Sequence, residues 1–268
     1  MSDWNAELYL RFAEERTRPC RDLAARIEVD APRRIVDLGC GPGNSTDVLG
    51  GRWPQADILG LDSSEEMIAA ARRERPGRRW ITADIVQWAA AAEPASFDVV
   101  FSNAALQWIG DHAAIFPRLL ALVAPGGALA VQVPNNIDAP PHTIARALAA
   151  SLSFRRRLPP EGVREWHAHD ATFYYDVLAP HSSRIDIWET EYLHIMPGTE
   201  AIVEWYTATG LRPYLSALPS EKDREEFVAE YLEALRPSFP PRANGSVLFP
   251  FQRLFMIAYT ERRSTAVR

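Results

Sequence analysis

Cysteine and long apolar runs are scarce in this sequence. Cys20 and Cys40 are its only cysteines, too few for the disulfide framework that is typical of small secreted proteins. No segment approaches the roughly 20 consecutive apolar residues that a membrane-spanning helix needs. The first residues, Met1-Ser2-Asp3-Trp4-Asn5, lack the basic start and the apolar stretch of an export signal. We therefore expect a cytoplasmic protein without membrane contact.

Positive charge is also in deficit, because the formal net charge at pH 7 is -6. Binding to nucleic-acid phosphates requires a surplus of basic residues, so we expect no nucleic-acid partner. His167, His169 and Asp170 lie close in sequence, but no further ligand follows at a recognisable spacing, and we expect no metal. An anionic ligand must then be bound locally, and nearly all the cations that could bind it are arginines, since Lys222 is the only lysine.

The most informative segment is an apolar run that is followed directly by a glycine-rich turn. Residues 34–38 read Arg-Ile-Val-Asp-Leu, and Gly39-Cys40-Gly41-Pro42-Gly43 follows at once. Such a run is typical of a strand buried on both faces, and the glycines leave room for a ligand against the backbone. The helix that follows offers N–H groups to an anion. The pattern predicts a nucleotide-type cofactor site, with a simple tight turn as the alternative.

Further apolar strands alternate with helical segments along the chain. The strands are predicted at 34–38, 57–61, 80–82, 97–101 and 127–133, with two more near 185–188 and 255–259. Polar residues stand just after several of them, where open α/β sheets bind ligands. Pro125-Gly126 is expected to end the helix before the fifth strand. Asp62-Ser63-Ser64 is expected to cap the helix after the second. The pattern predicts a doubly wound, mostly parallel α/β sheet.

These motifs together resemble the class I S-adenosylmethionine-dependent methyltransferases. The resemblance is carried by Val36-Asp37-Leu38-Gly39-Cys40-Gly41-Pro42-Gly43, Gly60-Leu61-Asp62-Ser63-Ser64, Phe97-Asp98-Val99-Val100 and Leu122-Val123-Ala124-Pro125-Gly126-Gly127. It implies a seven-stranded Rossmann-like sheet with a mainly helical substrate cap, and S-adenosyl-L-methionine as the cofactor. A nicotinamide-dependent dehydrogenase is a poorer alternative, because its sheet can mimic the first motif but does not usually add the Pro-Gly-Gly strand entry.

The same resemblance implies a set of cofactor-binding residues. They are Arg18, Asp37, Gly39, Gly41, Asp62, Met67, Asp84, Ile85 and Asn103. Asp37 would lie by the methionine part of the cofactor, Asp62 on the ribose hydroxyls, and Asp84 with Ile85 at the adenine. Two plainer explanations stay open: Asp62 as a helix cap, and Asp84 as a turn residue. Cys40 is expected to be a small packing residue, since no histidine stands beside it in sequence.

Segments outside these motifs resemble a narrower family, the trans-aconitate methyltransferases. They include Met1-Ser2-Asp3-Trp4-Asn5, Asn103-Ala104-Ala105-Leu106-Gln107-Trp108, Thr207-Ala208-Thr209-Gly210-Leu211-Arg212-Pro213 and Pro250-Phe251-Gln252-Arg253-Leu254-Phe255. The resemblance implies O-methylation of one carboxylate of a small tricarboxylic acid. A carboxylate has an unperturbed pKa of about 4 and needs no general base near neutral pH. We accordingly predict no catalytic acid or base, only positioning.

Arginine is suited to binding carboxylates, so the substrate candidates combine arginines with aromatic residues. They are Arg16, Trp108, Tyr175, Trp205, Tyr206, Arg212 and Arg253. The alternatives are that the arginines are solvated surface residues and that the aromatic residues only pack the core. Alternative functions are methylation of another small carboxylic acid, and cofactor binding without catalysis.

The length of 268 residues fits one large domain with a substrate-binding elaboration. We predict a single methyltransferase domain over 1–268. Its parts are an N-terminal lid helix at 1–30, a cofactor-binding core at 31–136, a substrate cap at 137–245 and a final strand at 246–260. Within the cap, residues 153–172 are expected to form a loop, and Phe227, Val228, Tyr231, Leu232 and Leu235 a core-facing helical stripe. The sequence leaves the oligomeric state open.

Overall fold

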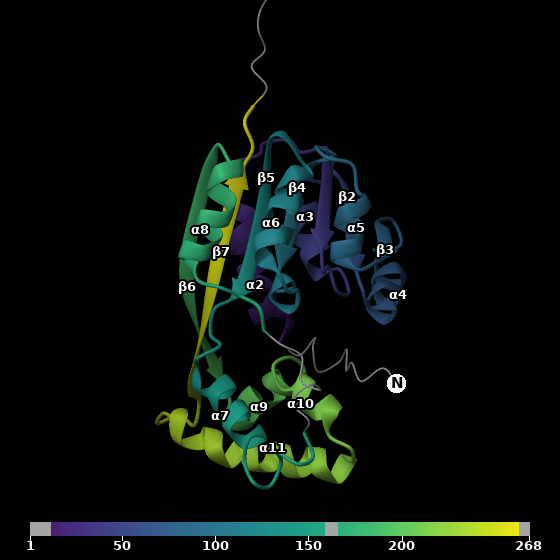
Figure 1. Ribbon diagram of the computed structural model, residues 1–268. Helices are drawn as coiled ribbons and strands as arrows, with labels where there is room; N and C mark the ends of the chain where they lie inside the picture. The colour runs from purple at the N-terminus through teal and green to yellow at the C-terminus, as the bar shows by residue number, and fades with distance from the viewer. Residues whose placement is uncertain (1–11, 159–165, 263–268) are drawn as a thin grey trace, which may run out of the picture. The chain divides into compact units, whose positions relative to one another are not determined.

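The computed structural model describes residues 12–158 and 166–262. Its centre is a seven-stranded sheet with the strand order β3-β2-β1-β4-β5-β7-β6 (Figure 1). The chain divides into two compact units. Of the described residues, one unit comprises 12–15, 136–158, 166 and 191–252, and the other comprises 16–135, 167–190 and 253–262. We call the first the helical unit and the second the sheet unit. The predicted doubly wound, seven-stranded sheet is confirmed.

The strands follow the apolar runs of the sequence. They are β1 Arg34–Leu38, β2 Asp57–Asp62, β3 Arg79–Thr82, β4 Phe97–Asn103, β5 Val123–Pro134, β6 Arg184–Met196 and β7 Val247–Tyr259. Parallel pairing joins β3, β2, β1, β4 and β5, whereas β7 runs antiparallel to β5. The carboxyl ends of β1, β2 and β4 therefore meet at one edge of the sheet, which we call the carboxyl edge.

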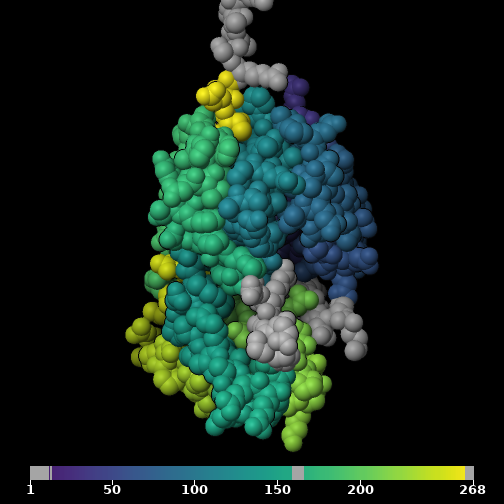
Figure 2. Space-filling view, in the orientation of Figure 1, coloured from purple at the N-terminus to yellow at the C-terminus, as the bar shows by residue number. Residues whose placement is uncertain are grey.

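Helices cover the sheet of the sheet unit on both faces. They are α2 Ala13–Arg26, α3 Asn44–Arg52, α4 Glu65–Glu74, α5 Ile85–Ala91, α6 His112–Ala121 and α8 Ala171–Leu178, of which α2 begins in the helical unit. Figures 1 and 2 show α6 and α8 covering the face turned to the viewer. Beneath them lies a core of alternate strand residues such as Val36, Leu38, Val100, Leu129 and Met256. Alternation is expected because successive side chains of a strand point to opposite faces.

The helical unit is built around a second apolar core. Its helices are α7 Pro140–Ala149, α9 Thr199–Thr207, α10 Arg212–Ala217 and α11 Glu221–Leu235. The predicted stripe on α11 is confirmed: Phe227, Tyr231 and Leu235 are buried, and the other two members are partly buried against the same core. The hydroxyl of Tyr231 donates to the carbonyl of Pro141 at 3.0 Å, which ties α11 to the start of α7. Burial raises the pKa of this hydroxyl.

Three sequence predictions need correction or restriction. The fifth strand begins at Val123, so Pro125-Gly126 lies within the strand and does not end the preceding helix. Gly126 has a φ of +81°, which lets the strand bend at this point. The predicted 153–172 loop is shorter at its end, since α8 begins at Ala171 after an N-cap at Asp170. The start of that segment also packs inward, with Phe154 fully buried. Residues 1–11 of the lid helix and 159–165 of the loop lie outside the described residues.

A buried polar pair fastens α8 to α6. The Nε2 atom of His112 faces the carbonyl of Leu106 at 2.9 Å, so it carries the proton, and Nδ1 accepts from the Tyr174 hydroxyl at 2.8 Å. That hydroxyl in turn accepts from the backbone N–H of His169. Burial lowers the pKa of His112, which keeps the imidazole neutral.

Replacing Tyr174 with Phe tests this pair. The substitution leaves the buried Nδ1 of His112 without a donor and the His169 N–H without this acceptor, so we expect the free energy of unfolding to fall by about 1–3 kcal/mol. Urea denaturation measures this. The matched control is Tyr175→Phe, whose hydroxyl sits on a side chain 55% exposed, and which should change stability by less than about 0.5 kcal/mol. Equal effects of the two substitutions would contradict the role of the pair.

Candidate functional site

Asp37 lies near the carboxyl end of β1 and is fully buried. Its Oδ2 accepts hydrogen bonds from the hydroxyls of Ser45 and Thr46, each at 2.6 Å. Its Oδ1 has no donor among the described residues. Burial raises the pKa of Asp37 to about 6. The hydrogen bonds from the two hydroxyls lower the pKa, because they favour the charged form, and the neighbouring charge of Asp62 raises it. The sequence analysis did not predict that Ser45 and Thr46 bind Asp37. Two hydroxyl residues in the first turn of the helix after the glycine turn could have indicated it.

The glycines of the turn after β1 serve different purposes. A Cβ on Gly39 would lie 2.2 Å from the Cβ of Ala105, so this glycine allows the turn to pack against the segment after β4. A Cβ on Gly41 would meet nothing within 4 Å. Both have positive φ, +71° and +54°. The open space for a ligand is therefore at Gly41, whereas Gly39 is required by packing.

Asp62, at the end of β2, joins this turn to the next helix. Its Oδ2 accepts from the N–H of Gly41 and its Oδ1 from the N–H of Ser64, both at 2.9 Å. The N-cap of α4 is Ser64, whose hydroxyl accepts from the N–H of Met67 at 3.3 Å. The plainer explanation of Asp62 as the helix cap is therefore wrong. Each oxygen of Asp62 also retains a second lone pair with which to accept from a ligand hydroxyl.

The other cofactor candidates differ in their burial and in their hydrogen-bond partners. Asp84 is the N-cap of α5, where its Oδ1 accepts from the N–H of Gln87 at 2.9 Å, and Ile85 beside it is buried. Asn103 ends β4, and its Oδ1 has no donor among the described residues. Arg18 is exposed on α2. Because β1 pairs with both β2 and β4, the structure brings Asp37, Asp62 and Asn103 to the same edge of the sheet.

The three candidate arginines are not alike. Arg16 on α2 is 8% exposed and Arg253 on β7 only 3%, so the alternative that they are solvated surface residues is wrong for both. Arg253 donates from Nη1 to Oε1 of Gln132 on β5 at 3.2 Å. Arg212 is exposed at the start of α10 in the helical unit. Gln132 was missed by the sequence analysis, although a glutamine inside an otherwise apolar strand was a signal.

Packing accounts for two of the candidate aromatic residues. Trp205 and Tyr206 on α9 are each 2% exposed and contact the ring of Phe249 within the core of the helical unit. The Tyr206 hydroxyl accepts from Nδ2 of Asn136 at 3.0 Å. Trp108, half-buried, ends the short helix η1 Leu106–Trp108 after β4. Tyr175 is exposed on α8 of the sheet unit.

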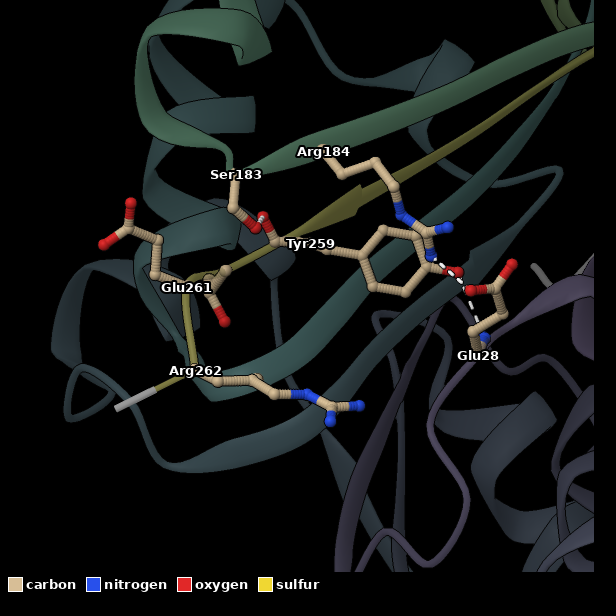
Figure 3. A pocket seen from close by; sticks show the side chains of 8 residues that line it. Glu28, Ser183, Arg184, Tyr259, Glu261 and Arg262 are labelled. Atoms are coloured by element: carbon tan, nitrogen blue, oxygen red, sulfur yellow. Dashed lines mark hydrogen bonds and ion pairs between the residues drawn. The ribbon is translucent and has the colours of Figure 1, made fainter. Parts of the chain in front are cut away.

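A pocket of the sheet unit lies away from all these residues (Figure 3). It surrounds Tyr259, which pairs with Ala128 near the start of β5 and so lies at the edge opposite the carboxyl edge. Several of its polar side chains bond to one another or to nearby backbone. Arg184 pairs with Glu28 at 2.7 Å, and the Ser183 hydroxyl donates to the carbonyl of Tyr259. No residue predicted from the sequence to bind a ligand lines it.

Both cysteines are buried, and burial raises the pKa of each thiol. Cys40 packs with Ile68, Ala71 and Trp80, so the expectation of a small packing residue is confirmed. Within residues 12–158 and 166–262, no group of three or more His, Cys, Asp or Glu side chains could hold a metal ion. None of the helices described is long and apolar enough to cross a membrane.

This chain is similar to known methyltransferases. Residues 35–127 match the family model described as a methyltransferase domain. The YcgJ protein of Bacillus subtilis has a similar fold, with a TM-score of 0.59 at 14% identity over 91% of this chain and 99% of that one. Phosphoethanolamine N-methyltransferase 2 of Haemonchus contortus, solved with S-adenosyl-L-methionine, gives a TM-score of 0.55 at 17% identity over 92% of this chain and 53% of that one. The fold and motif define a methyltransferase of class I.

The sequence relatives narrow this class to one family. The trans-aconitate 2-methyltransferase of Acidovorax sp. (strain JS42) is 46% identical over 258 residues, which cover 96% of this chain and 98% of the relative. The protein of the same name from Yersinia pestis (strain Pestoides F) is 44% identical over 98% of this chain and 100% of the relative. The chain belongs to the trans-aconitate 2-methyltransferase family.

Proposed function

We propose that this enzyme transfers a methyl group from S-adenosyl-L-methionine to a carboxylate of trans-aconitate. The products are the monomethyl ester and S-adenosylhomocysteine. The observation that carries the proposal is the similarity to trans-aconitate 2-methyltransferases over nearly the whole length of both chains. The arginines Arg16 and Arg253 in the sheet unit support it, because a guanidinium can bind a carboxylate through two parallel hydrogen bonds.

The residues at the carboxyl edge fit the cofactor. Gly41 leaves open space beside the backbone, and Oδ1 of Asp37 and Oδ1 of Asn103 are acceptors without a donor among the described residues. We assign the methionine part of the cofactor to these two side chains and its ribose to Asp62. Asp84 with Ile85 stays our proposal for the adenine. When bound, the cofactor supplies an electrophilic methyl group on a sulfonium.

The protein's own contribution is to position the acid and to exclude water. An acceptor carboxylate is already ionised near neutral pH, so no residue needs to remove a proton. Alignment of two reactants can lower the barrier by about 7–11 kcal/mol. We propose that Arg16 and Arg253 hold carboxylates of the acid through charge-assisted hydrogen bonds. Met67 on α4 and Arg18 on α2 stay proposed cofactor contacts.

The pH dependence of cofactor binding tests the role of Asp37. The α-ammonium of the cofactor favours the ionised carboxylate, whereas the free protein holds the pKa of Asp37 at about 6. Below that value a proton must be lost on binding, so affinity should fall about tenfold from pH 7 to pH 5. The stability of the free protein should change with pH in the opposite direction to the affinity, because the folded state binds the Asp37 proton more tightly than the unfolded chain does. Its stability should decline as the pH rises from about 4 to 6.

Titration calorimetry at pH 5, 6 and 7 measures the affinity, and urea denaturation the stability. Asp37→Asn is the control, because it removes the titrating group while keeping the shape, and should flatten both profiles. A wild-type affinity that is constant between pH 5 and 7 would contradict the assignment of Asp37 to the ammonium.

The activity itself is tested by methyl transfer from labelled S-adenosylmethionine to a panel of acids. The panel contains trans-aconitate, cis-aconitate, citrate, isocitrate and long-chain acids, and cofactor binding is measured in parallel. Turnover strongest on trans-aconitate is the expected result. Stronger turnover on another acid would change the substrate but keep the reaction. Cofactor binding without any methylated acid would overturn the proposal in favour of a non-catalytic role.

A further inference from the structure

One face of the sheet carries a row of polar side chains along its carboxyl edge. Residues directly opposite each other on paired strands share a face, as do alternate residues of one strand. Asn103 on β4 is opposite Gln132 on β5, and Arg253 on β7 is opposite Pro134, two residues further along β5. Asp37 on β1 is opposite Phe101, two residues before Asn103. Asp37, Asn103, Gln132 and Arg253 therefore share one face, in that order across the sheet.

Gln132 is fully buried in this row, and its orientation is fixed by its partner. Arg253 donates from Nη1 to Oε1 of Gln132. A guanidinium has only donors, so the amide must turn its oxygen towards Arg253 and its nitrogen away. The Nε2 atom then carries two N–H groups, and it has no acceptor among the described residues and no exposure to solvent.

A buried N–H without an acceptor costs folding free energy, and such groups in native proteins call for an explanation. A ligand oxygen explains it here. The row begins at the acidic Asp37 and ends at the cationic Arg253, so a negatively charged group is favoured at the end where Gln132 and Arg253 lie. The structural alternative is that Nε2 of Gln132 donates to Oδ1 of Asn103, which also has no partner among the described residues. Asn103 is opposite Gln132 in the sheet. A bond between the two amides would need only a side-chain shift.

We propose that Gln132 is a substrate-binding residue: its Oε1 orients the Arg253 guanidinium, and its Nε2 donates to a carboxylate of the acid. The inference rests on the proposed function, since it names a further contact for the acid of that reaction. A neutral amide suits this place. It accepts from the guanidinium without adding a negative charge that would repel the acid.

Gln132→Glu tests the inference, because it is nearly isosteric and keeps an acceptor for Arg253. It replaces the donor by a negative oxygen that pairs with Arg253 and repels the acid. We expect the KM for trans-aconitate to rise at least about tenfold, since a charge-assisted contact is lost and a repulsion is added. The kcat should change less than threefold, and the Kd for S-adenosylmethionine less than twofold. Gln132→Met, which removes both polar atoms, should raise the KM in the same direction and serves if the first variant does not fold.

The matched control is Gln55→Glu, which makes the same charge change at an exposed residue between α3 and β2, at the opposite edge of the sheet. It should leave KM and Kd unchanged. A variant of Gln132 with altered thermal stability but unchanged KM would overturn the inference and favour the bond to Asn103. Equal losses of acid and cofactor binding would also overturn it. Absence of wild-type turnover on trans-aconitate would instead overturn the proposed function, and the inference with it.

Discussion

Replacing Asp62 with Ala is expected to weaken S-adenosylmethionine binding by about 100-fold or more. The carboxylate is the proposed acceptor for two ribose hydroxyls, and each lost charge-assisted hydrogen bond is worth about 1.5–3 kcal/mol. The same substitution removes the acceptors for the N–H groups of Gly41 and Ser64, so the turn that faces the ligand loses its anchor. Titration calorimetry measures the Kd of the variant against wild type.

Ser64→Ala separates cofactor binding from helix capping in this experiment. It removes the hydroxyl that caps α4 but leaves both oxygens of Asp62 in place. We expect it to lower stability by about 0.5–2 kcal/mol and to change the Kd less than twofold. The Kd of Asp62→Asn should lie between those of Asp62→Ala and Ser64→Ala, because asparagine keeps the shape of the side chain and one acceptor oxygen. If Asp62→Ala lowered stability but kept the Kd within threefold of wild type, the residue would only organise the turn.

The cofactor half of the site could be predicted from the sequence because its determinants are local. Asp37 and Gly41 stand in one short segment, and an apolar run followed by glycines defines both the strand and the turn. Asp62 follows its own strand in the same way. The order of the parallel strands then brings the three residues to one edge. What the segment could not show is that Gly39 is required by Ala105, a contact made only when β4 pairs with β1.

The acid half of the site depends on contacts between distant parts of the chain. Gln132 and Arg253 are 121 residues apart in sequence, and they meet only through the antiparallel register of β5 and β7. Nothing local specifies that register. Adjacent tyrosines show the same limit: Tyr175 was the candidate from the sequence, and the structure shows that Tyr174 is the buried one of the two. The N-cap of α8 at Asp170 sets which tyrosine faces α6, and the sequence analysis had placed a loop there.

Replacing Arg253 with Met is expected to raise the KM for trans-aconitate about 100-fold. The long apolar side chain fills most of the volume of the arginine stem, so the buried position on β7 stays packed. The guanidinium is lost, and with it the paired charge-assisted hydrogen bonds that one carboxylate can accept, about 1.5–3 kcal/mol each. Steady-state kinetics with varied acid measures the effect. The Kd for S-adenosylmethionine should change less than twofold, because Arg253 is separated from Asp37 by β4 and β5 in the sheet.

Arg79→Met provides the matched control for this prediction. Arg79 forms a surface ion pair with Asp57 at 2.6 Å, and its side chain is 66% exposed. Loss of such a pair should cost less than about 1 kcal/mol of stability and leave the KM unchanged. Loss of acid and cofactor binding to the same extent in Arg253→Met would mean that Arg253 supports the sheet rather than the substrate. A selective loss of acid binding would instead place the carboxylate at the cationic end of the polar row, beside Gln132, where its charge lies farthest from that of Asp37.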